Sequence, residues 1–293
     1  MQTQVELRVD SHSVIGEGPI WDGQKQVLYW VDIMGHKLHI YDPVRDENAT
    51  LDVGQPVGTV VPRASGGVML ALEHGFAAFD PDTQALTMIH DPEADLPGNR
   101  FNDGKCDPAG RFWAGTMAFE DQAGQGSLYC LDAHLSVRKM LGQISISNGI
   151  VWSLDHATMY FIDSLAYDVK AFDYDIHTGD IRNGRIAIQI PTGIGLADGM
   201  AIDSEGMLWI AQFGGSRVCR WNPATGEMLH TISLPVSKVT ACAFGDNNLD
   251  TLYITSAAPA DMTAEERSRE PHAGGLFAIQ PGWRGVPEFP FNG

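Results

Sequence analysis

Four polar residues occur at one register of a repeated segment in this chain of 293 residues: Glu17, Asn102, Asn148 and Asp198. Each stands five positions before a short polar turn, and these turns begin at Asp22, Asp107, Ser153 and Asp203. If the segments are equivalent in space, the four side chains surround a common axis. Two carboxylates and two amides that converge on one point would form an oxygen-donor metal site.

Such a ligand set suits hard divalent ions such as Ca²⁺, Mg²⁺ or Mn²⁺ better than a structural zinc ion. Three protein ligands would leave coordination positions open for water and substrate, as in catalytic metal sites. An ion there could polarise a carbonyl group and lower the pKa of bound water. Asp198 could act both as a ligand and as the general base that orients an attacking water.

Glycine follows three of the four residues, in Glu17-Gly18, Asn148-Gly149 and Asp198-Gly199. Taken singly, Asn-Gly and Asp-Gly pairs are most often simple turns. The offset shared between segments favours the ring instead, since glycine allows the backbone to pass close to an axis.

Further polar residues surround Asn102, which can both donate and accept hydrogen bonds. Arg100 offers a planar fork of donors that suits sugar hydroxyls or a carboxylate, and a surface salt bridge is its alternative role. We expect Glu120 to reach the same cavity. The histidines lack metal-site spacing, and we expect surface or loop positions for His36, His39, His74 and His272.

Short β-rich segments dominate the chain and recur at intervals of about 40–50 residues. One recurring apolar strand occupies 28–32, 69–73, 112–116, 159–163, 208–212 and 252–256. A second strand follows each copy. Six copies of a four-strand unit predict an all-β fold, a six-bladed β-propeller with four antiparallel strands per blade. A β-sandwich would also contain many short strands, but not with this sixfold period.

The segment before each recurring strand should be innermost and line the central channel. These segments are 16–21, 57–62, 102–106, 148–152, 198–202 and 239–244. The four polar residues lie at their entry ends, so we expect a metal site at the mouth of the channel. Blades two and six carry Thr59 and Thr240 there, which are weaker ligands. We expect residues 5–9 to close the last blade, so that 1–293 forms a single domain.

One insertion, 257–273, interrupts the sixth unit. Thr263 and Glu266 form a capping box, which predicts a short helix ending near Arg269. This insertion could be a lid over the channel mouth or a solvated excursion, and the sequence favours neither.

Bulk composition narrows the classes of function. The formal net charge of −18 should repel phosphate backbones and anionic lipid, so we expect neither nucleic-acid nor membrane partners. The four cysteines have no metal-site spacing and are expected to be buried reduced thiols. A signal-like N-terminus is absent, and no apolar run approaches the ~20 residues of a membrane span. We therefore expect a cytoplasmic enzyme or binding protein.

Five motifs in order, at 16–19, 100–104, 115–117, 147–149 and 197–200, resemble the SMP-30/gluconolactonase/regucalcin family. The resemblance extends from about residue 13 to about residue 280 and implies a six-bladed propeller. It implies a divalent ion on Glu17, Asn148 and Asp198; Ca, Mn, Mg, Zn or Fe(II) are the candidates. It also implies substrate contacts from Arg100, Asn102, Asp103 and Glu120.

The activity implied by the resemblance is hydrolysis of sugar lactones to aldonic acids, with Asp198 as the base. Gluconolactone or a pentonolactone such as xylono- or arabinonolactone would be the substrate. One alternative is a propeller hydrolase of aryl esters or organophosphates, which would need a more apolar mouth. Another is a non-enzymatic, calcium-binding propeller. WD-type scaffolds repeat a Trp-Asp pair in each blade, but Trp21-Asp22 does not recur here.

Overall fold

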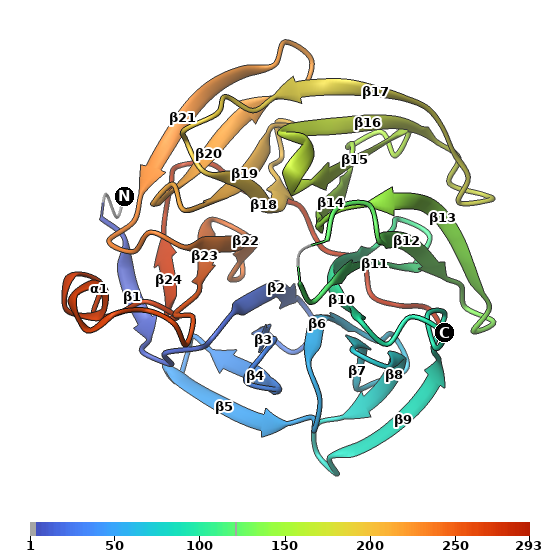
Figure 1. The fold of residues 1–293 in the computed structure, drawn as a ribbon, viewed down its shortest axis with the longest axis horizontal. Helices are drawn as coiled ribbons and strands as arrows, with labels where there is room; N and C mark the ends of the chain where they lie inside the picture. Colours follow the sequence, from blue (N-terminus) through green and yellow to red (C-terminus); the bar gives the residue numbers. More distant parts are fainter. Residues whose placement is uncertain (1–3, 121) are drawn as a thin grey trace.

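The computed structural model describes residues 4–120 and 122–293, which form six four-stranded antiparallel sheets around a central opening (Figure 1). This arrangement confirms the predicted six-bladed β-propeller. Each blade runs outward from its innermost strand in chain order, except the last, which takes its outer strand from the N-terminal segment.

The first three blades occupy the first half of the chain. Blade one consists of β2 (Gly16–Asp22), β3 (Val27–Asp32), β4 (Lys37–Asp42) and β5 (Glu47–Asp52). Blade two consists of β6 (Val57–Pro62), β7 (Val68–Leu72), β8 (Gly75–Asp80) and β9 (Ala85–His90). Blade three consists of β10 (Asn99–Cys106), β11 (Phe112–Ala118), β12 (Gly126–Leu131) and β13 (Val137–Ile144).

The other three blades follow. Blade four consists of β14 (Ser147–Trp152), β15 (Thr158–Asp163), β16 (Asp168–Tyr174) and β17 (Ile181–Gln189), with a 3-10 turn, η1 (Ser164–Ala166), between β15 and β16. Blade five consists of β18 (Leu196–Ile202), β19 (Leu208–Phe213), β20 (Arg217–Asn222) and β21 (Glu227–Ser233). Blade six consists of β22 (Val239–Gly245), β23 (Thr251–Ser256), β24 (Leu276–Ile279) and β1 (Glu6–Val9).

The ring closes between the first and last blades. β1 pairs antiparallel with β24, with Glu6 opposite Ala278 and Leu7 opposite Phe277. The inner strands β2 and β22 are also in contact, so each inner strand touches the inner strands of both neighbouring blades. Because the ring is closed, every inner strand packs between two neighbouring blades.

All six innermost strands carry a register irregularity at the same depth. The shifts lie between Glu17 and Ile20, Val57 and Thr59, Phe101 and Gly104, Ser147 and Ile150, Ala197 and Met200, and Val239 and Cys242. A bulge interrupts the ladder and redirects side chains. The bulges therefore free Asn102, Asn148 and Asp198 from pairing within their own blades, whereas Glu17 remains opposite Val31.

A buried aspartate in the following turn fixes the C-terminal end of two inner strands, β10 and β18. Asp107 and Asp203 are fully buried, and each accepts a 2.9 Å hydrogen bond from a tryptophan, Trp113 and Trp209 respectively. Their second carboxylate oxygens accept hydrogen bonds from backbone N–H groups of the turn. This fixed turn explains why the polar position lies five residues upstream in each of these two blades.

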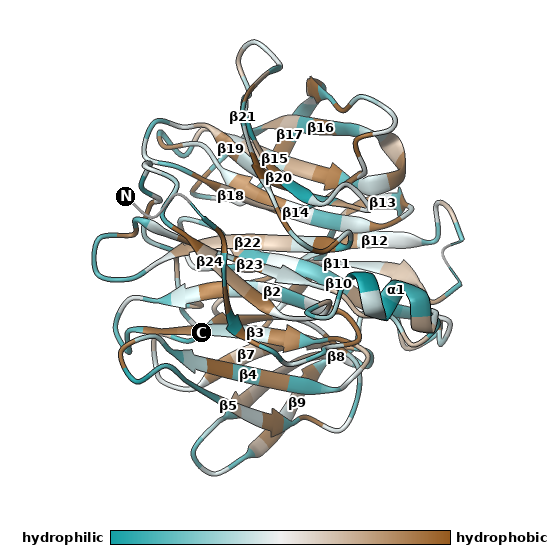
Figure 2. Ribbon diagram, turned by 90° about the vertical axis from the view of Figure 1, so that its left-hand side faces the viewer, coloured by the Kyte–Doolittle hydropathy of each residue, from teal (hydrophilic) through white to brown (hydrophobic). Residues whose placement is uncertain are grey.

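Apolar side chains fill the space between blades. Trp30, Trp113 and Trp209 occupy matching second strands and are fully buried. Figure 2 shows hydrophobic stretches along the strands and hydrophilic loops at their ends. Adjacent blades therefore bury each other's faces, as repeat stacking requires. All four cysteines are buried and unpaired.

The segment after β24 crosses one end of the channel and joins blades that are not neighbours. Gly285 N–H donates to Leu249 O of blade six at 2.7 Å, and Phe291 N–H donates to Pro62 O of blade two at 2.8 Å. Between these points, Glu288 accepts a 3.0 Å hydrogen bond from Lys105 Nζ. This C-terminal segment therefore ties the blades together at that end.

The predicted short helix is present as α1 (Ala264–Arg269), with both hydrogen bonds of the capping box formed around Thr263 and Glu266. It buries no side chain. Figure 1 shows it at the rim beside β1, away from the central opening, which favours the solvated excursion over the lid. In the described residues, no helix is long and apolar enough to cross a membrane.

The expectation that His39 lies at the surface was wrong. Its side chain is buried in β4 and stacks on Trp30, with ring centroids 3.9 Å apart. Burial lowers the pKa of His39 to about 4, because desolvation penalises the imidazolium more than the nearby Asp32 carboxylate favours it.

Candidate metal and substrate site

The three predicted metal ligands meet at the channel from three blades. Glu17 comes from β2, Asn148 from β14 and Asp198 from β18, and their exposed fractions are 3 %, 4 % and 7 %. The Asp198 carboxyl group lies close to Glu17, whose pKa its charge raises, and the Asn148 side chain also borders it. The structure thus brings together side chains separated by up to 181 positions, 198 − 17, in the sequence.

Close approach of the inner strands makes this convergence possible. A Cβ atom on Gly149 would lie 2.8 Å from Asp198 O of the next blade. A Cβ atom on Gly199 would lie 2.4 Å from Ala241 Cβ. Larger residues would push blades four, five and six apart, so the glycines beside Asn148 and Asp198 serve packing rather than only turning the chain.

Burial and nearby acidic groups destabilise the charged forms of both carboxyl groups. Burial raises the pKa of Glu17 well above its ordinary value, and the charges of Asp198 and Asp103 raise it further. Burial also raises the pKa of Asp198, and Asp103 adds to this rise. Hydrogen bonds from the Gly18 and Gly199 N–H groups oppose these shifts. A cation between the two carboxyl groups would reverse them.

The donor chemistry fits a divalent cation. Among the described residues, neither Glu17 nor Asp198 forms a salt bridge with Lys, Arg or His. The same part of the chain contains no group of three His, Cys, Asp or Glu side chains arranged for a metal. The candidate ligands are instead the carboxylates of Glu17 and Asp198 and the amide oxygen of Asn148. All three are hard oxygen donors.

Asn102 connects this set to Arg100. The Asn102 side-chain amide donates to Ser147 O at 2.8 Å and to Asn148 Oδ1 at 3.3 Å. Its own Oδ1 accepts a 2.7 Å hydrogen bond from Arg100 Nη1. Asn102 therefore lies between the candidate metal ligands and the arginine, as the sequence motif suggested.

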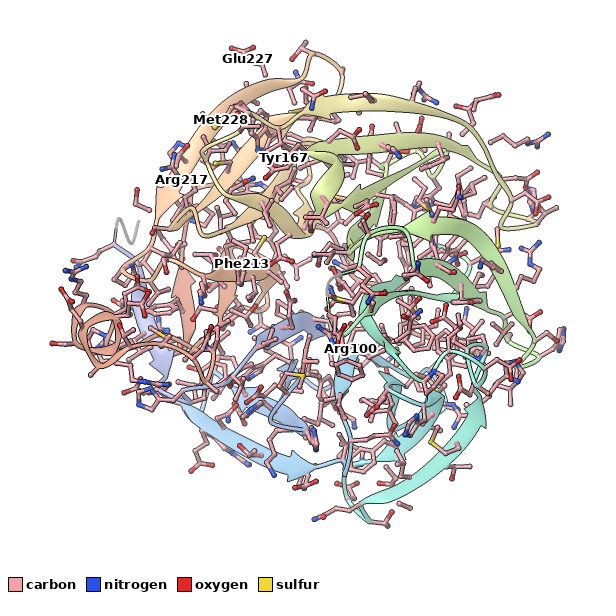
Figure 3. All side chains as sticks on the ribbon, in the orientation of Figure 1. Arg100, Tyr167, Phe213, Arg217, Glu227 and Met228 are labelled. Atoms are coloured by element: carbon pink, nitrogen blue, oxygen red, sulfur yellow. The ribbon has the colours of Figure 1, made fainter. Side chains whose placement is uncertain are left out.

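Arg100 is buried to 6 % exposure and is not a surface side chain. It also donates to Phe101 O at 3.0 Å, and the Phe119 ring lies 5.8 Å from the guanidinium carbon. Figure 3 places Arg100 beside the central opening, whereas Glu227 and Met228 lie at the outer edge. Phe119 is 38 % exposed and borders the arginine. None of the sequence motifs singled it out.

Asp103 is half-buried, in contrast to the buried side chains of Asn102, Asn148 and Asp198. It lines a small channel cavity together with Gly18, Lys105 and Gly199. Burial raises the pKa of Asp103 to about 6, although Lys105 and the 2.6 Å hydrogen bond from Gly104 N–H act in the opposite direction. Lys105 is itself buried and brings a positive charge to this cavity, although the sequence motifs did not single it out.

Glu120 stands apart from the ring. Its side chain is exposed and accepts a 3.3 Å hydrogen bond from Gln122 Nε2. It lines a surface hollow with Asn99 and Phe119, so it lies near the mouth. Its contact with substrate stays a prediction.

The two threonines at the equivalent ring positions have structural partners. Thr59 Oγ1 donates to Gly104 O at 3.1 Å, and Thr240 Oγ1 donates to Gly16 O at 2.5 Å. Each bond joins one inner strand to that of the next blade. Thr59 and Thr240 therefore link neighbouring inner strands, and their hydroxyl groups already donate hydrogen bonds to backbone carbonyls.

Comparison with known proteins assigns the chain to a family. The family described as SMP-30/gluconolactonase/LRE-like region matches residues 15–258, which contain every predicted site residue. The chain belongs to this family. The six-bladed fold described above is thus the fold of an SMP-30/gluconolactonase-like chain.

Several relatives of this SMP-30/gluconolactonase-like chain cover almost its whole length. A regucalcin of Gallus gallus is 45 % identical over 285 residues, 95 % of each chain. YvrE of Bacillus subtilis (strain 168), named as a sugar lactone lactonase, is 41 % identical over 287 residues, 98 % of each chain. The crystal structure of a calcium-binding protein, regucalcin, from Agrobacterium tumefaciens strain C58 is 27 % identical, with a TM-score of 0.93 over 98 % of this chain and 96 % of that chain.

Proposed function

We propose that this protein hydrolyses sugar lactones to aldonic acids with the help of one divalent metal ion. Glu17, Asn148 and Asp198 would hold the ion, and Arg100 and Asn102 would hold the substrate. The observation that carries the proposal is the convergence of two buried carboxyl groups and one amide beside a buried arginine. Membership of the lactonase-containing family and the name of the Bacillus subtilis relative support it.

A bound ion would supply Lewis-acid polarisation of the lactone carbonyl and a lower pKa for the attacking water. Asp198 would accept a proton from that water as its oxygen forms a bond to the carbonyl carbon. The bond between the carbonyl carbon and the ring oxygen then breaks, and the proton passes to the ring oxygen. The product is an open-chain hydroxy acid that ionises in water, so no other reactant is needed.

Arg100 and Asn102 would set the orientation of the sugar. Arg100 offers several donors in one plane, and Asn102 already fixes one of its nitrogen atoms. A substrate held in this way approaches the attacking water in one geometry, and positioning of this kind contributes several kcal/mol to such reactions. The polar lining disfavours aryl esters, which would need apolar contacts.

A comparison of hydrolysis rates for several classes of substrate tests this proposal. The protein is assayed with gluconolactone, a pentonolactone, an aryl ester and an organophosphate triester, with each spontaneous rate subtracted. We expect the highest kcat/KM with a sugar lactone and a large loss in the Asp198→Asn variant. Preference for the aryl ester or the triester would reject the lactonase assignment.

Calcium binding without turnover is the second candidate function. The regucalcin from Agrobacterium tumefaciens is described as a calcium-binding protein, and the hard oxygen donors here suit Ca²⁺. Tight Ca²⁺ binding combined with no turnover of any lactone would favour this function.

A further inference from the structure

Ser164 connects two of the candidate metal ligands, although it lies outside every motif that pointed to the site. It is the first residue of η1 and is 3 % exposed. Its Oγ accepts a 2.8 Å hydrogen bond from Asn148 Nδ2 and donates a 2.6 Å hydrogen bond to Ala197 O. Ala197 directly precedes Asp198, so one hydroxyl contacts both ligand-bearing strands.

The direction of these bonds is fixed by chemistry. A carbonyl oxygen can only accept, so the single hydroxyl proton of Ser164 must go to Ala197 O. Ser164 Oγ can then only accept from Asn148, and the group facing it must be the NH₂ end of that amide. Asn148 Oδ1 consequently points the other way, toward Asn102.

The same reasoning holds at the other end of the chain of bonds. Ser147 O can only accept, so the NH₂ end of Asn102 faces blade four. Arg100 can only donate, which agrees with Asn102 Oδ1 facing the arginine. The donors therefore run in one direction from Arg100 through Asn102, Asn148 and Ser164 to Ala197.

Ser164 is itself held firmly by the backbone. Its N–H donates to Ile146 O at 3.1 Å, and the preceding Asp163 accepts hydrogen bonds from Ser145 N–H and Ile146 N–H at 3.0 Å. Both contacts lock η1 onto the loop that enters β14. The hydroxyl is therefore pre-positioned relative to Asn148.

We propose that Ser164 is a positioning residue that orients the Asn148 carboxamide so that its oxygen, and not its NH₂ group, faces the metal ion. This inference rests on the proposed metal site and adds a residue outside the ligand set. Without the Ser164 hydroxyl, only the 3.3 Å hydrogen bond from Asn102 Nδ2 holds the amide in this orientation. More of the amide can then turn over, and the reversed amide presents N–H groups to a cation. Changes in residues that support metal ligands typically weaken metal affinity about 10–100-fold.

Isothermal titration calorimetry of the metal-stripped protein with Mn²⁺ and Ca²⁺ tests this role. We expect Ser164→Ala to weaken binding by about 10–100-fold. Ser164→Cys, which nearly preserves the volume but offers only a weak acceptor, should weaken it in the same direction. Ser147→Ala is the matched control, because that buried hydroxyl has no hydrogen-bond partner among the described residues. Its affinity should stay within about twofold of the wild type.

A double-mutant cycle separates amide orientation from general support. In the Asn148→Asp background both terminal atoms at position 148 are oxygens, so no orientation has to be chosen. Adding Ser164→Ala there should change affinity by less than about threefold. An equal loss in both backgrounds would overturn the proposed role, as would wild-type affinity in the two single Ser164 variants. Absence of metal binding by the wild type would instead reject the metal site itself.

Discussion

Asn102 Nδ2 donates a hydrogen bond to Asn148 Oδ1 across the boundary between blades three and four, at 3.3 Å. Asn148 is a candidate metal ligand, and Asn102 accepts from Arg100. The substrate side and the metal side of the proposed site are therefore in direct contact. An amide oxygen has two lone pairs, so this bond leaves one free for a cation.

Removal of Arg100 should weaken substrate binding without weakening metal binding. We expect Arg100→Ala to raise KM for a sugar lactone about tenfold or more, since hydrogen bonds to charged groups contribute about 1.5–3 kcal/mol. Metal binding should not weaken, because the positive charge of Arg100 acts on Glu17 and its loss removes a repulsion. Steady-state kinetics and calorimetry measure the two effects. Arg185→Ala, in an exposed pair with Asp173, is the control and should leave KM unchanged.

Replacing the buried Asp198 carboxylate with an amide should have opposite effects on stability in the metal-free and the metal-bound protein. In metal-free protein at neutral pH, Asp198→Asn should be at least as stable as the wild type, because two like charges no longer share a buried site. With Ca²⁺ at about 100 times its Kd, the wild type should gain about 2.7 kcal/mol, and the variant should gain much less. Thermal unfolding with and without Ca²⁺ measures this. Equal gains in both proteins would contradict the placement of the ion at Asp198.

The turn aspartates should matter more for stability than exposed acidic residues. Asp203 is fully buried and accepts hydrogen bonds from Trp209 Nε1 and from Arg220 Nε at 2.7 Å. Asp203→Ala would leave Arg220 without this partner, and we expect a loss of about 3–5 kcal/mol. Asp173→Ala, which breaks the exposed Arg185 pair, should cost far less, because solvent screens an exposed ion pair. Urea unfolding of both variants gives the comparison, and similar losses would refute it.

Buried His39 should make stability depend on pH in one direction. The pKa of His39 is about 4 in the folded protein, below its ordinary value of 6.5. The unfolded chain therefore binds more protons between these values, and stability falls as pH drops from 6.5 to about 4. The largest contribution is of the order of 3 kcal/mol, at about 1.36 kcal/mol per unit. In His39→Phe, which keeps a ring against Trp30, this part of the pH dependence should disappear from urea midpoints measured across that range.

Regular repetition made much of the architecture predictable. The register of Glu17, Asn148 and Asp198 relative to the following turn is visible in the sequence because a short polar turn follows each of these inner strands. The capping box of α1 was predictable for a similar reason, since its hydrogen bonds are local to Thr263 and Glu266.

Contacts that depend on long-range packing were not predictable. Ser164 acts through an acceptor on another blade, and nothing near it in the chain indicates this. Glu288 meets Lys105 across 183 positions of sequence. His39 was assigned to the surface because its stacking on Trp30 depends on how two strands pair and not on its own neighbours. The position of α1 at the rim likewise depends on the path of the 257–273 insertion.

The most direct test of the proposed metal-dependent lactonase activity is reconstitution of the metal-stripped protein. Mn²⁺ or Ca²⁺ is added stepwise, and hydrolysis of gluconolactone is followed in a pH-stat, with the spontaneous rate subtracted. We predict activity that rises in proportion to occupancy and saturates at one ion per chain, with no recovery in Asn148→Ala at the same ion concentrations. Full lactonase activity in the metal-free protein, or equal recovery in Asn148→Ala, would contradict the account.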